Sequence, residues 1–236
     1  PFDNVNIRKA LNLSLDRNVI TDKVLGQGQT PTYVFTPTYI EEGQLIQQPA
    51  YSKEPMAQRN EEAIKLLEEA GYSKANPLKF SILYNTNENH KKVAIAAASM
   101  WKANTKGLID VKLENQEWKT YIDSRRAGRY DAARAGWNAD YNQATTFGNY
   151  FLSNSSNNTA KYANPEYDKA IAESYVATDA EGRAKAYAKA EEILAKDFGI
   201  VPIFNYVNPR LVKPYVKGYS GKDPQDHIYL RNLYII

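Results

Sequence analysis

An alternation of strand-like and helix-like patterns in the middle of the chain restricts the fold most. Apolar side chains occupy every second position in residues 78–84 and 109–113, and a third predicted strand, residues 130–136, begins with the apolar run 130–133. Residues 90–104 and 117–127, which separate these runs, have helical patterns. Strands separated by helices of this length are typical of an α/β layer with at least partly parallel pairing. The sequence therefore predicts an α/β fold in which helices flank a mixed sheet.

Further helices are predicted on both sides of this layer. Residues 56–70 have an amphipathic pattern that stops at Gly71, and residues 147–152 are expected to form one or two helical turns. Other helices are expected to begin at residues whose side chains commonly cap a helix N-terminus, namely Asp3 or Asn4, Asp16, Asn164 and Asp179. The helices after the last two caps are expected to run to about residues 176 and 196.

Two segments lack a regular period. Residues 27–55 contain several prolines and no apolar repeat, and so long an irregular segment inside a domain is usually a binding or covering loop. Residues 200–207 are strand-like. The chain then continues in short extended pieces broken by proline and glycine, and residues 228–236 are apolar and extended.

The composition excludes several classes of protein. A net charge of +3, from 30 basic and 27 acidic residues, is too balanced for a nucleic-acid-binding or anionic-membrane-binding protein. Without cysteine there are no disulfides, thiolate metal sites or cysteine nucleophiles. No apolar run approaches the roughly 18 residues of a membrane helix. The chain begins with Pro1 rather than methionine, so we expect it to be processed or truncated.

Catalytic, metal and cofactor motifs are not evident. The two histidines, His90 and His227, lie far apart and lack metal-ligand spacing with neighbouring acids. No nucleophile elbow, phosphate-binding loop or dinucleotide fingerprint is present. We therefore expect no enzyme activity, no metal and no cofactor.

The best candidate for ligand binding is the segment from Arg134 to Asp140, at the end of the predicted strand over residues 130–136; it also contains Trp137. Ligands of α/β proteins are commonly bound at the ends of strands. An aspartate there holds an ammonium group, an arginine holds a carboxylate, and a tryptophan walls a pocket. Both signs of charge together suit a zwitterion such as a peptide. The alternative is a surface Arg–Asp ion pair beside a core tryptophan.

Three stretches carry a resemblance: residues 1–17, residues 116–118 with 131–140, and residues 207–215 with 221–224. Together they resemble the periplasmic oligopeptide-binding proteins of ABC importers, extracellular solute-binding protein family 5. The resemblance covers the whole chain.

Members of that family are about twice as long and have two lobes that close on the ligand. The resemblance therefore implies the C-terminal half of a two-lobed periplasmic-binding-protein fold, type II, peptide-binding cluster. Residues 1–200 would form the C-terminal ligand-binding lobe. Residues 201–236 would cross back as strands of the largely missing first lobe.

The resemblance implies that both peptide termini bind to this chain. Asp140 would hold the α-ammonium group. Arg134, Arg125 and His90 would lie where family members receive the peptide carboxylate, different residues serving ligands of different length. From the residues alone, Arg125 is equally an ordinary helix-surface charge, and His90 an exposed histidine.

The resemblance also implies how the rest of the peptide is held. Trp118 and Trp137 would line roomy, wet side-chain pockets, and Gly136 and Asn138 would offer backbone hydrogen bonds. Tyr206, near the hinge, would also reach the ligand. Trp118, at the start of a helix, is alternatively a core residue.

The function implied is binding of oligopeptides in the periplasm of a Gram-negative bacterium and their delivery to the membrane permease of an ABC importer. Affinity would come from the main chain and termini, so sequence preference would be small. The expected partners are the peptide, the permease and the missing first lobe, and no nucleic acid. Alternatives are a related binder of dipeptides, murein peptides or haem, or a stand-alone interaction module. A hydrolase using Asp140 lacks a second acid nearby.

Overall fold

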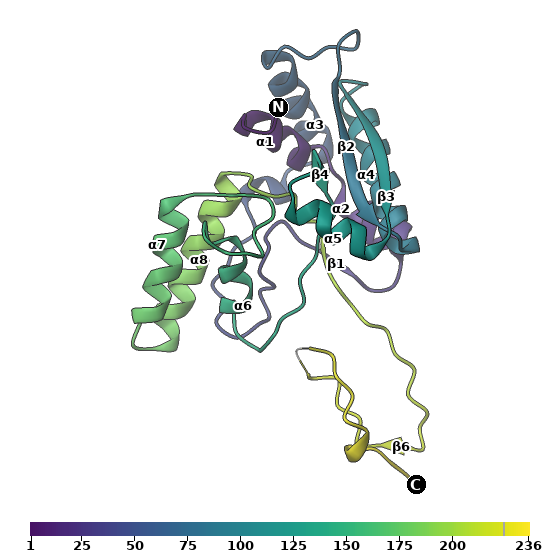
Figure 1. Cartoon of the computed structure of the whole chain (residues 1–236), viewed down its shortest axis with the longest axis vertical. Helices are drawn as coiled ribbons and strands as arrows, with labels where there is room; N and C mark the ends of the chain where they lie inside the picture. Colours follow the sequence, from purple (N-terminus) through teal and green to yellow (C-terminus); the bar gives the residue numbers. More distant parts are fainter. Residues whose placement is uncertain (224) are drawn as a thin grey trace.

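The structure, a computed structural model, describes residues 1–223 and 225–236. Pro224, which belongs to the third of the resembling stretches, lies outside the described residues. Figure 1 shows a parallel sheet with its helices at the top, a smaller helical group beside it, and a C-terminal extension that points away from both. Among the described residues, no helix combines the length and the apolarity that crossing a membrane requires.

The largest sheet has three parallel strands in the order β3-β2-β4: β2 (Leu78–Asn85), β3 (Ile109–Gln116) and β4 (Ala132–Ala133). Strands β2 and β3 pair along their whole length, from Leu78 opposite Ile109 to Asn85 opposite Gln116. Helices α4 (Glu88–Asn104) and α5 (Trp118–Arg126) connect successive strands. The predicted α/β alternation with parallel pairing is therefore confirmed.

Strand β4 is shorter than the predicted strand over residues 130–136. Asp131 does not pair through its backbone; its carboxylate accepts hydrogen bonds from the Ser81 N–H at 2.8 Å and the Ser81 hydroxyl at 3.1 Å. After β4, the Arg134 N–H donates to the Leu83 carbonyl at 2.8 Å, and the chain then leaves the sheet. Before β4, the side chain of Asp131 thus takes the place of backbone pairing with β2. After β4, the candidate ligand loop begins at Arg134.

Antiparallel pairing occurs in separate two-stranded sheets rather than in one mixed sheet. Strand β1 (Thr30–Pro31) pairs with β5 (Phe204–Asn205), and β6 (Val216–Lys217) pairs with β7 (Tyr234–Ile235). Most of the predicted strand 200–207 is unpaired. Proline lacks the N–H that a ladder needs, and side chains from the first two helices bind carbonyl groups of this segment and of the residues just before it.

These side chains belong to α1 (Val5–Leu13) and to the first residue of α2 (Arg17–Val19). Arg8 donates to the Asp197 carbonyl at 2.7 Å, Asn12 to the Ile200 carbonyl at 3.0 Å, and the buried Arg17 to the Pro202 carbonyl at 2.6 Å. The segment leading to Tyr206 is therefore held by donors almost 190 residues earlier in the chain.

One hydrophobic cluster lies between the sheet and helices α1, α3 (Met56–Glu69) and α4. The Phe80 ring contacts Phe2, with centroids 5.2 Å apart, and Trp101, with centroids 5.7 Å apart. The Trp101 indole N–H donates to the Leu11 carbonyl at 2.9 Å, so even the polar atom of this buried ring is satisfied. Truncating a buried tryptophan of this kind costs about 3–5 kcal/mol.

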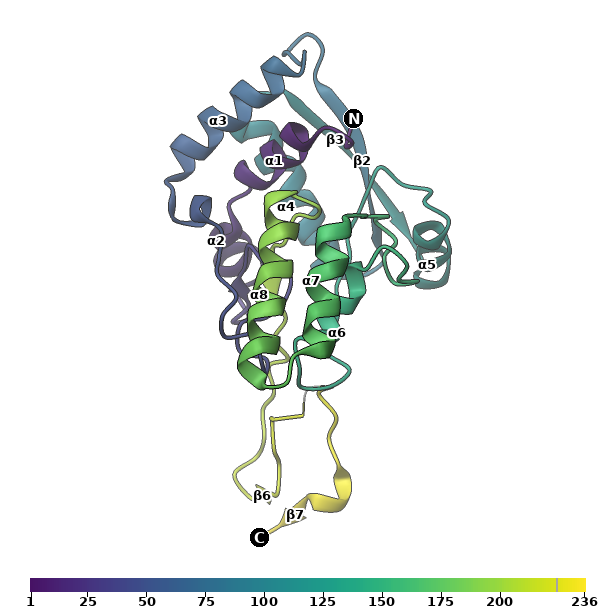
Figure 2. The ribbon, with the colours of Figure 1, turned by 90° about the vertical axis from the view of Figure 1, so that its left-hand side faces the viewer.

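A second cluster is built by α6 (Thr145–Gly148), η3 (Asn149–Phe151), α7 (Pro165–Val176) and α8 (Ala180–Lys196). Figure 2 shows α7 and α8 side by side. The ring of Phe35, from the long irregular segment, inserts among the rings of Phe147, Tyr150 and Phe151.

The same segment is held to α8 by Glu191. This buried carboxylate accepts hydrogen bonds from the Phe35 N–H at 3.1 Å, the Thr36 N–H at 2.8 Å and the Thr36 hydroxyl at 2.5 Å. Burial raises the pKa of Glu191, and the bonds from Thr36 and Phe35 oppose that rise. Phe35 and Ile40 of the predicted covering loop thus pack on the second cluster, whereas Tyr51 packs against the first.

The remaining elements are short. They are the helical segments α2 (Arg17–Val19), η1 (Ile20–Leu25), η2 (Ala50–Lys53) and η4 (Leu230–Asn232). The predicted N-caps are confirmed, since the side chains of four residues accept hydrogen bonds from the first helical turn: Asn4, Asp16, Asn164 and Asp179. Helix α4 begins before residue 90, the predicted start, because Asn87 caps it.

Among the described residues after Tyr206, the hydrogen bonds and the strand pairing join parts of this tail to one another. In Figures 1 and 2 the tail extends from the body and folds back on itself through β6 and β7. Large apolar side chains in this tail are exposed, with Leu211 at 104% and Ile235 at 75% relative exposure.

Candidate functional site

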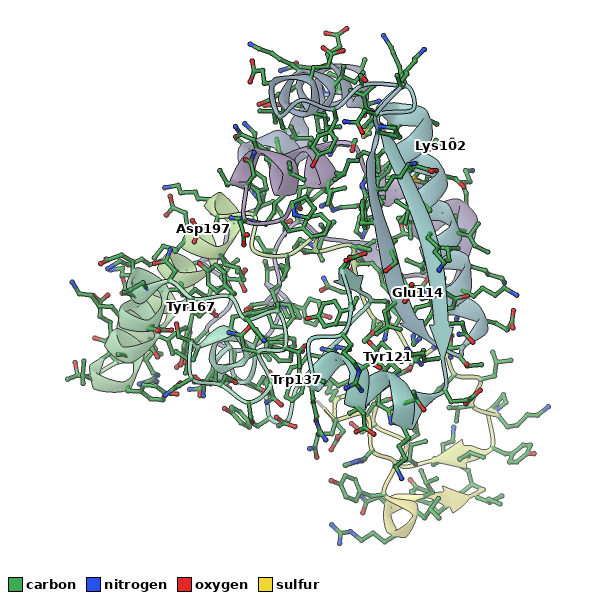
Figure 3. All side chains as sticks on the ribbon, turned by 45° about the horizontal axis from the view of Figure 1, so that its top comes forward. Lys102, Glu114, Tyr121, Trp137, Tyr167 and Asp197 are labelled. Atoms are coloured by element: carbon green, nitrogen blue, oxygen red, sulfur yellow. The ribbon has the colours of Figure 1, made fainter. Side chains whose placement is uncertain are left out.

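The predicted ligand loop connects the two halves of the body. It leaves the sheet at Arg134 and ends at α6, and the half-buried Trp137 packs against the second cluster. Figure 3 shows Trp137 on this loop and Tyr121 on α5. The residues between Arg134 and Asp140 therefore lie where sheet and helical group meet.

The cationic end of the loop is built around Arg134. Its guanidinium group donates to the Tyr206 hydroxyl, with Cζ 5.6 Å from the centre of the Tyr206 ring. The Tyr121 hydroxyl donates to the Arg134 carbonyl and fixes the backbone at this point.

Gly136 permits this arrangement. A Cβ atom added at residue 136 would lie 2.7 Å from Cζ of Tyr206 and closer still to its hydroxyl oxygen. Because real Cβ atoms do not approach other atoms this closely, any side chain at residue 136 would displace Tyr206.

His90 belongs to the same end of the site. Its Nδ1 lies 2.8 Å from Oδ1 of Asn85, which makes Nδ1 the protonated nitrogen of the neutral ring. Burial, and secondly the charge of Arg134, lower the pKa of His90 to about 4. His90 is therefore neutral at pH 7, and an approaching carboxylate would favour its protonation.

The anionic end of the loop is organised by the Thr146 hydroxyl. It accepts from the Trp137 indole N–H at 3.3 Å and the Asp140 N–H at 3.1 Å, and donates to Asp140 Oδ2 at 3.3 Å. The Trp137 ring meets Tyr150 edge to face at 5.1 Å. Asp140 itself is exposed.

Two further predicted residues lie on α5. Trp118 is 59% exposed, and its ring centre lies 5.7 Å from that of Tyr121, so the alternative of a core tryptophan is wrong. The guanidinium group of Arg125 donates to the hydroxyls of Tyr150 and Thr159, both at 3.0 Å. Arg125 therefore links α5 to the second cluster rather than lying free on the surface.

The structure thus brings His90, Arg134, Gly136 and Tyr206 together and places Trp137 and Asp140 at the other end of the same loop. Asn138 is exposed between them. Arg134 and Asp140 do not form the surface ion pair considered as an alternative, because each is bonded to a different hydroxyl.

Sequence reasoning missed Tyr121 and Thr146. Tyr121 lies one helical turn after Trp118 and one before Arg125, so its place on their face could have been found from spacing. Thr146 carries no comparable signal, since its contact with Asp140 depends on how the loop folds onto α6. In the part of the chain that the structure describes, no group of three or more acidic, histidine or cysteine side chains is arranged to hold a metal ion.

The chain is similar in sequence and in structure to known solute-binding proteins. Residues 1–159 match the model of the bacterial extracellular solute-binding proteins, family 5 Middle. The whole chain is 98% identical to 44% of the periplasmic oligopeptide-binding protein OppA of Haemophilus influenzae, and 54% identical to 43% of its counterpart in Salmonella typhimurium. The crystal structure of Haemophilus influenzae OppA in complex with RPPGFSPFR superposes with a TM-score of 0.94 and 97% identity, over all of this chain and 46% of that one.

The chain spans less than half the length of these relatives. The match to the family model nevertheless extends over 159 of its 236 residues, and the fold agrees with that of a solved member. This chain therefore belongs to the bacterial extracellular solute-binding proteins of family 5.

Proposed function

We propose that this chain is the C-terminal, peptide-anchoring lobe of a periplasmic oligopeptide-binding protein that delivers peptides to an ABC-type permease. The observation that carries the proposal is the 98% identity, over the whole chain, to a relative named for oligopeptide binding. The loop geometry supports it, because charges of opposite sign stand at the two ends of one short loop.

The proposed roles follow from the chemistry of each end. Asp140, exposed and oriented by Thr146, would hold the peptide α-ammonium group. Arg134 and His90 would receive the carboxylate, with His90 taking up a proton as it does so. Arg125 would serve this role only after giving up its bonds to Tyr150 and Thr159.

The other predicted residues would hold the middle of the peptide. The exposed Trp118 and the half-buried Trp137 would line side-chain pockets, and Gly136 and Asn138 would present backbone groups. Tyr206 would contact the ligand beside Arg134. The contacts to the main chain and termini would bind groups that all peptides share, so the protein would tolerate many peptide sequences. No catalytic role is proposed.

We also propose the division at about residue 200, with residues 1–200 as the lobe and 201–236 as strands of a first lobe. The exposed apolar side chains of the tail support it. Phe204 and Tyr206 remain packed on the lobe, so the free part would begin after Tyr206. Trypsin should cut the 236-residue chain first after Arg210, which Leu211 follows, leaving the body intact. Equally rapid cleavage within α7 and α8 would contradict the division.

The test of function is a calorimetric titration of a lysine-containing tripeptide and its N-acetylated form into the two-lobed protein. Binding of the free peptide and loss of binding on acetylation is the expected result, because acetylation removes the ammonium group that Asp140 would hold. Equal affinity for both forms would place the anchor elsewhere. Binding of neither form would favour murein peptides, dipeptides or haem as ligands.

A further inference from the structure

We infer that Thr146 is a positioning residue for Asp140: its hydroxyl sets the carboxylate in the orientation that receives an ammonium group. The inference rests on the proposed function and deepens it, because it explains how an exposed acidic side chain is held ready for a ligand.

A hydroxyl group has one proton to donate and two lone pairs that accept. The Trp137 indole N–H and the Asp140 N–H both donate to the Thr146 oxygen, at 3.3 and 3.1 Å. These two donors occupy both lone pairs. The single proton is then directed to Oδ2 of Asp140, 3.3 Å away.

Burial makes this arrangement stable. Thr146 is only 5% exposed, so water does not compete for its hydroxyl, although Asp140 itself is exposed. An isolated aspartate on a loop would sample several side-chain orientations, and ordering it on binding would reduce affinity. The bond from Thr146 removes that freedom in advance.

The bond also divides the carboxylate into two different oxygens. Oδ2 is occupied by Thr146, whereas Oδ1 accepts no hydrogen bond from the residues that the structure describes. Oδ1 therefore remains available for an ammonium group. The same hydroxyl holds the Trp137 indole, so the proposed pocket wall and the proposed anchor are placed by one atom.

The neighbouring residue supplies a matched control. Thr145 is also 5% exposed, but its hydroxyl lies 2.5 Å from Oε1 of Gln143 and 2.9 Å from the Tyr187 hydroxyl, away from Asp140. Thr146→Val and Thr145→Val are thus the same isosteric change at equally buried adjacent sites. Only the first removes the bond to the carboxylate.

The experiment measures, in the two-lobed protein, the ratio of affinities for a free and an N-acetylated tripeptide. Thr146→Val should lower this ratio about tenfold, the effect of losing one hydrogen bond to a charged group. Thr146→Ser, which restores the hydroxyl, and Thr145→Val should keep the wild-type ratio. Thermal unfolding of each variant separates this effect from a general loss of stability.

A wild-type ratio in Thr146→Val would overturn the inference and leave the proposed function intact. A wild-type protein that does not distinguish the two peptides would overturn both. If Thr146→Val does not fold, Thr146→Ala is measured in its place. It leaves room for water at the vacated position, and an unchanged ratio there would equally refute the positioning role.

Discussion

The two ends of the ligand loop are fixed by different kinds of contact. At the cationic end, Arg134 is bonded to Tyr206, 72 residues further along the chain, and Tyr206 is held against Gly136. At the anionic end, Asp140 is bonded to Thr146, six residues away, in the next turn of backbone. The cationic end is therefore fixed by a contact that is distant in sequence, whereas Asp140 at the anionic end is fixed by a contact that is close in sequence.

Because of this difference, changes at the two ends should affect different properties, namely the stability of the lobe and its affinity for a ligand. The cationic end ties the sheet, α5 and the start of the crossover segment together, so changes there should be felt throughout the lobe. At the anionic end Asp140 is exposed, and its side chain is bonded only to Thr146 among the described residues. A change at Asp140 should therefore reduce ligand binding while the lobe remains folded.

Asp140→Ala should have the largest effect on binding. Removing one partner of a charge pair that is buried in the complex costs about 3–5 kcal/mol of affinity. Calorimetry on the two-lobed protein measures the loss, and urea unfolding should show unchanged stability. Asp123→Ala serves as the control, because Asp123 is also an exposed aspartate but lies on α5 rather than on the loop. Near wild-type affinity in Asp140→Ala would remove Asp140 from its proposed role.

Gly136→Ala should destabilise the 236-residue chain by about 1–3 kcal/mol, the usual cost of forcing extra volume into a packed site. Tyr206→Phe removes the atom that the new Cβ meets first, so the double variant should lose less stability than the sum of the single changes. Gly221→Ala, whose Cβ would meet no atom closer than 3.5 Å, is the control in urea unfolding. Additive effects would argue against the contact.

Tyr121→Phe tests the cationic end more gently. It removes the hydroxyl that donates to the Arg134 carbonyl, so we expect a loss of about 1 kcal/mol in the free energy of unfolding. Tyr175→Phe, at an exposed tyrosine, should change stability much less. Equal effects of the two changes would mean that the buried hydroxyl does not brace the loop.

The smallest effect concerns His90. Its folded pKa of about 4 lies below the ordinary value of 6.5, so the neutral ring favours the folded state. That contribution is complete above pH 6.5 and is lost as the pH falls towards 4. An NMR titration of the imidazole in the isolated chain should give this midpoint. Arg134→Gln should raise it and Arg134→Lys should not; identical midpoints would show that Arg134 does not act on His90.

The same contrast explains how far the sequence could be used for prediction. Caps such as Asp179, the alternation along β2, and the position of the loop depend on neighbours within a few residues, and they were predictable. The contact of Arg134 with Tyr206 and that of Arg17 with Pro202 join segments 72 and 185 residues apart. No local sequence pattern indicates these two contacts. The family resemblance predicted Tyr206 as a ligand residue but not its contact with Arg134.

Strand β4 shows a further limit. The apolar run before Arg134 predicted a longer strand, but Asp131 satisfies Ser81 through its side chain. Periodicity does not reveal that a carboxylate will replace a backbone partner. Similarly, Arg125 was predicted from the resemblance as a ligand residue, whereas its bonds to Tyr150 and Thr159 could be found only in the fold.

The tryptophans of this chain differ in exposure, so their fluorescence can be used to follow ligand binding. Trp101 is 5% exposed and enclosed by the first cluster, so its fluorescence should be constant. Trp118 is 59% exposed, and Trp137 lies beside the proposed anchor with its indole bonded to Thr146. A change in the emission of this chain's tryptophans on adding ligand would therefore originate at the loop and α5. With Trp118→Phe, the emission of Trp137 alone would report occupancy of the site.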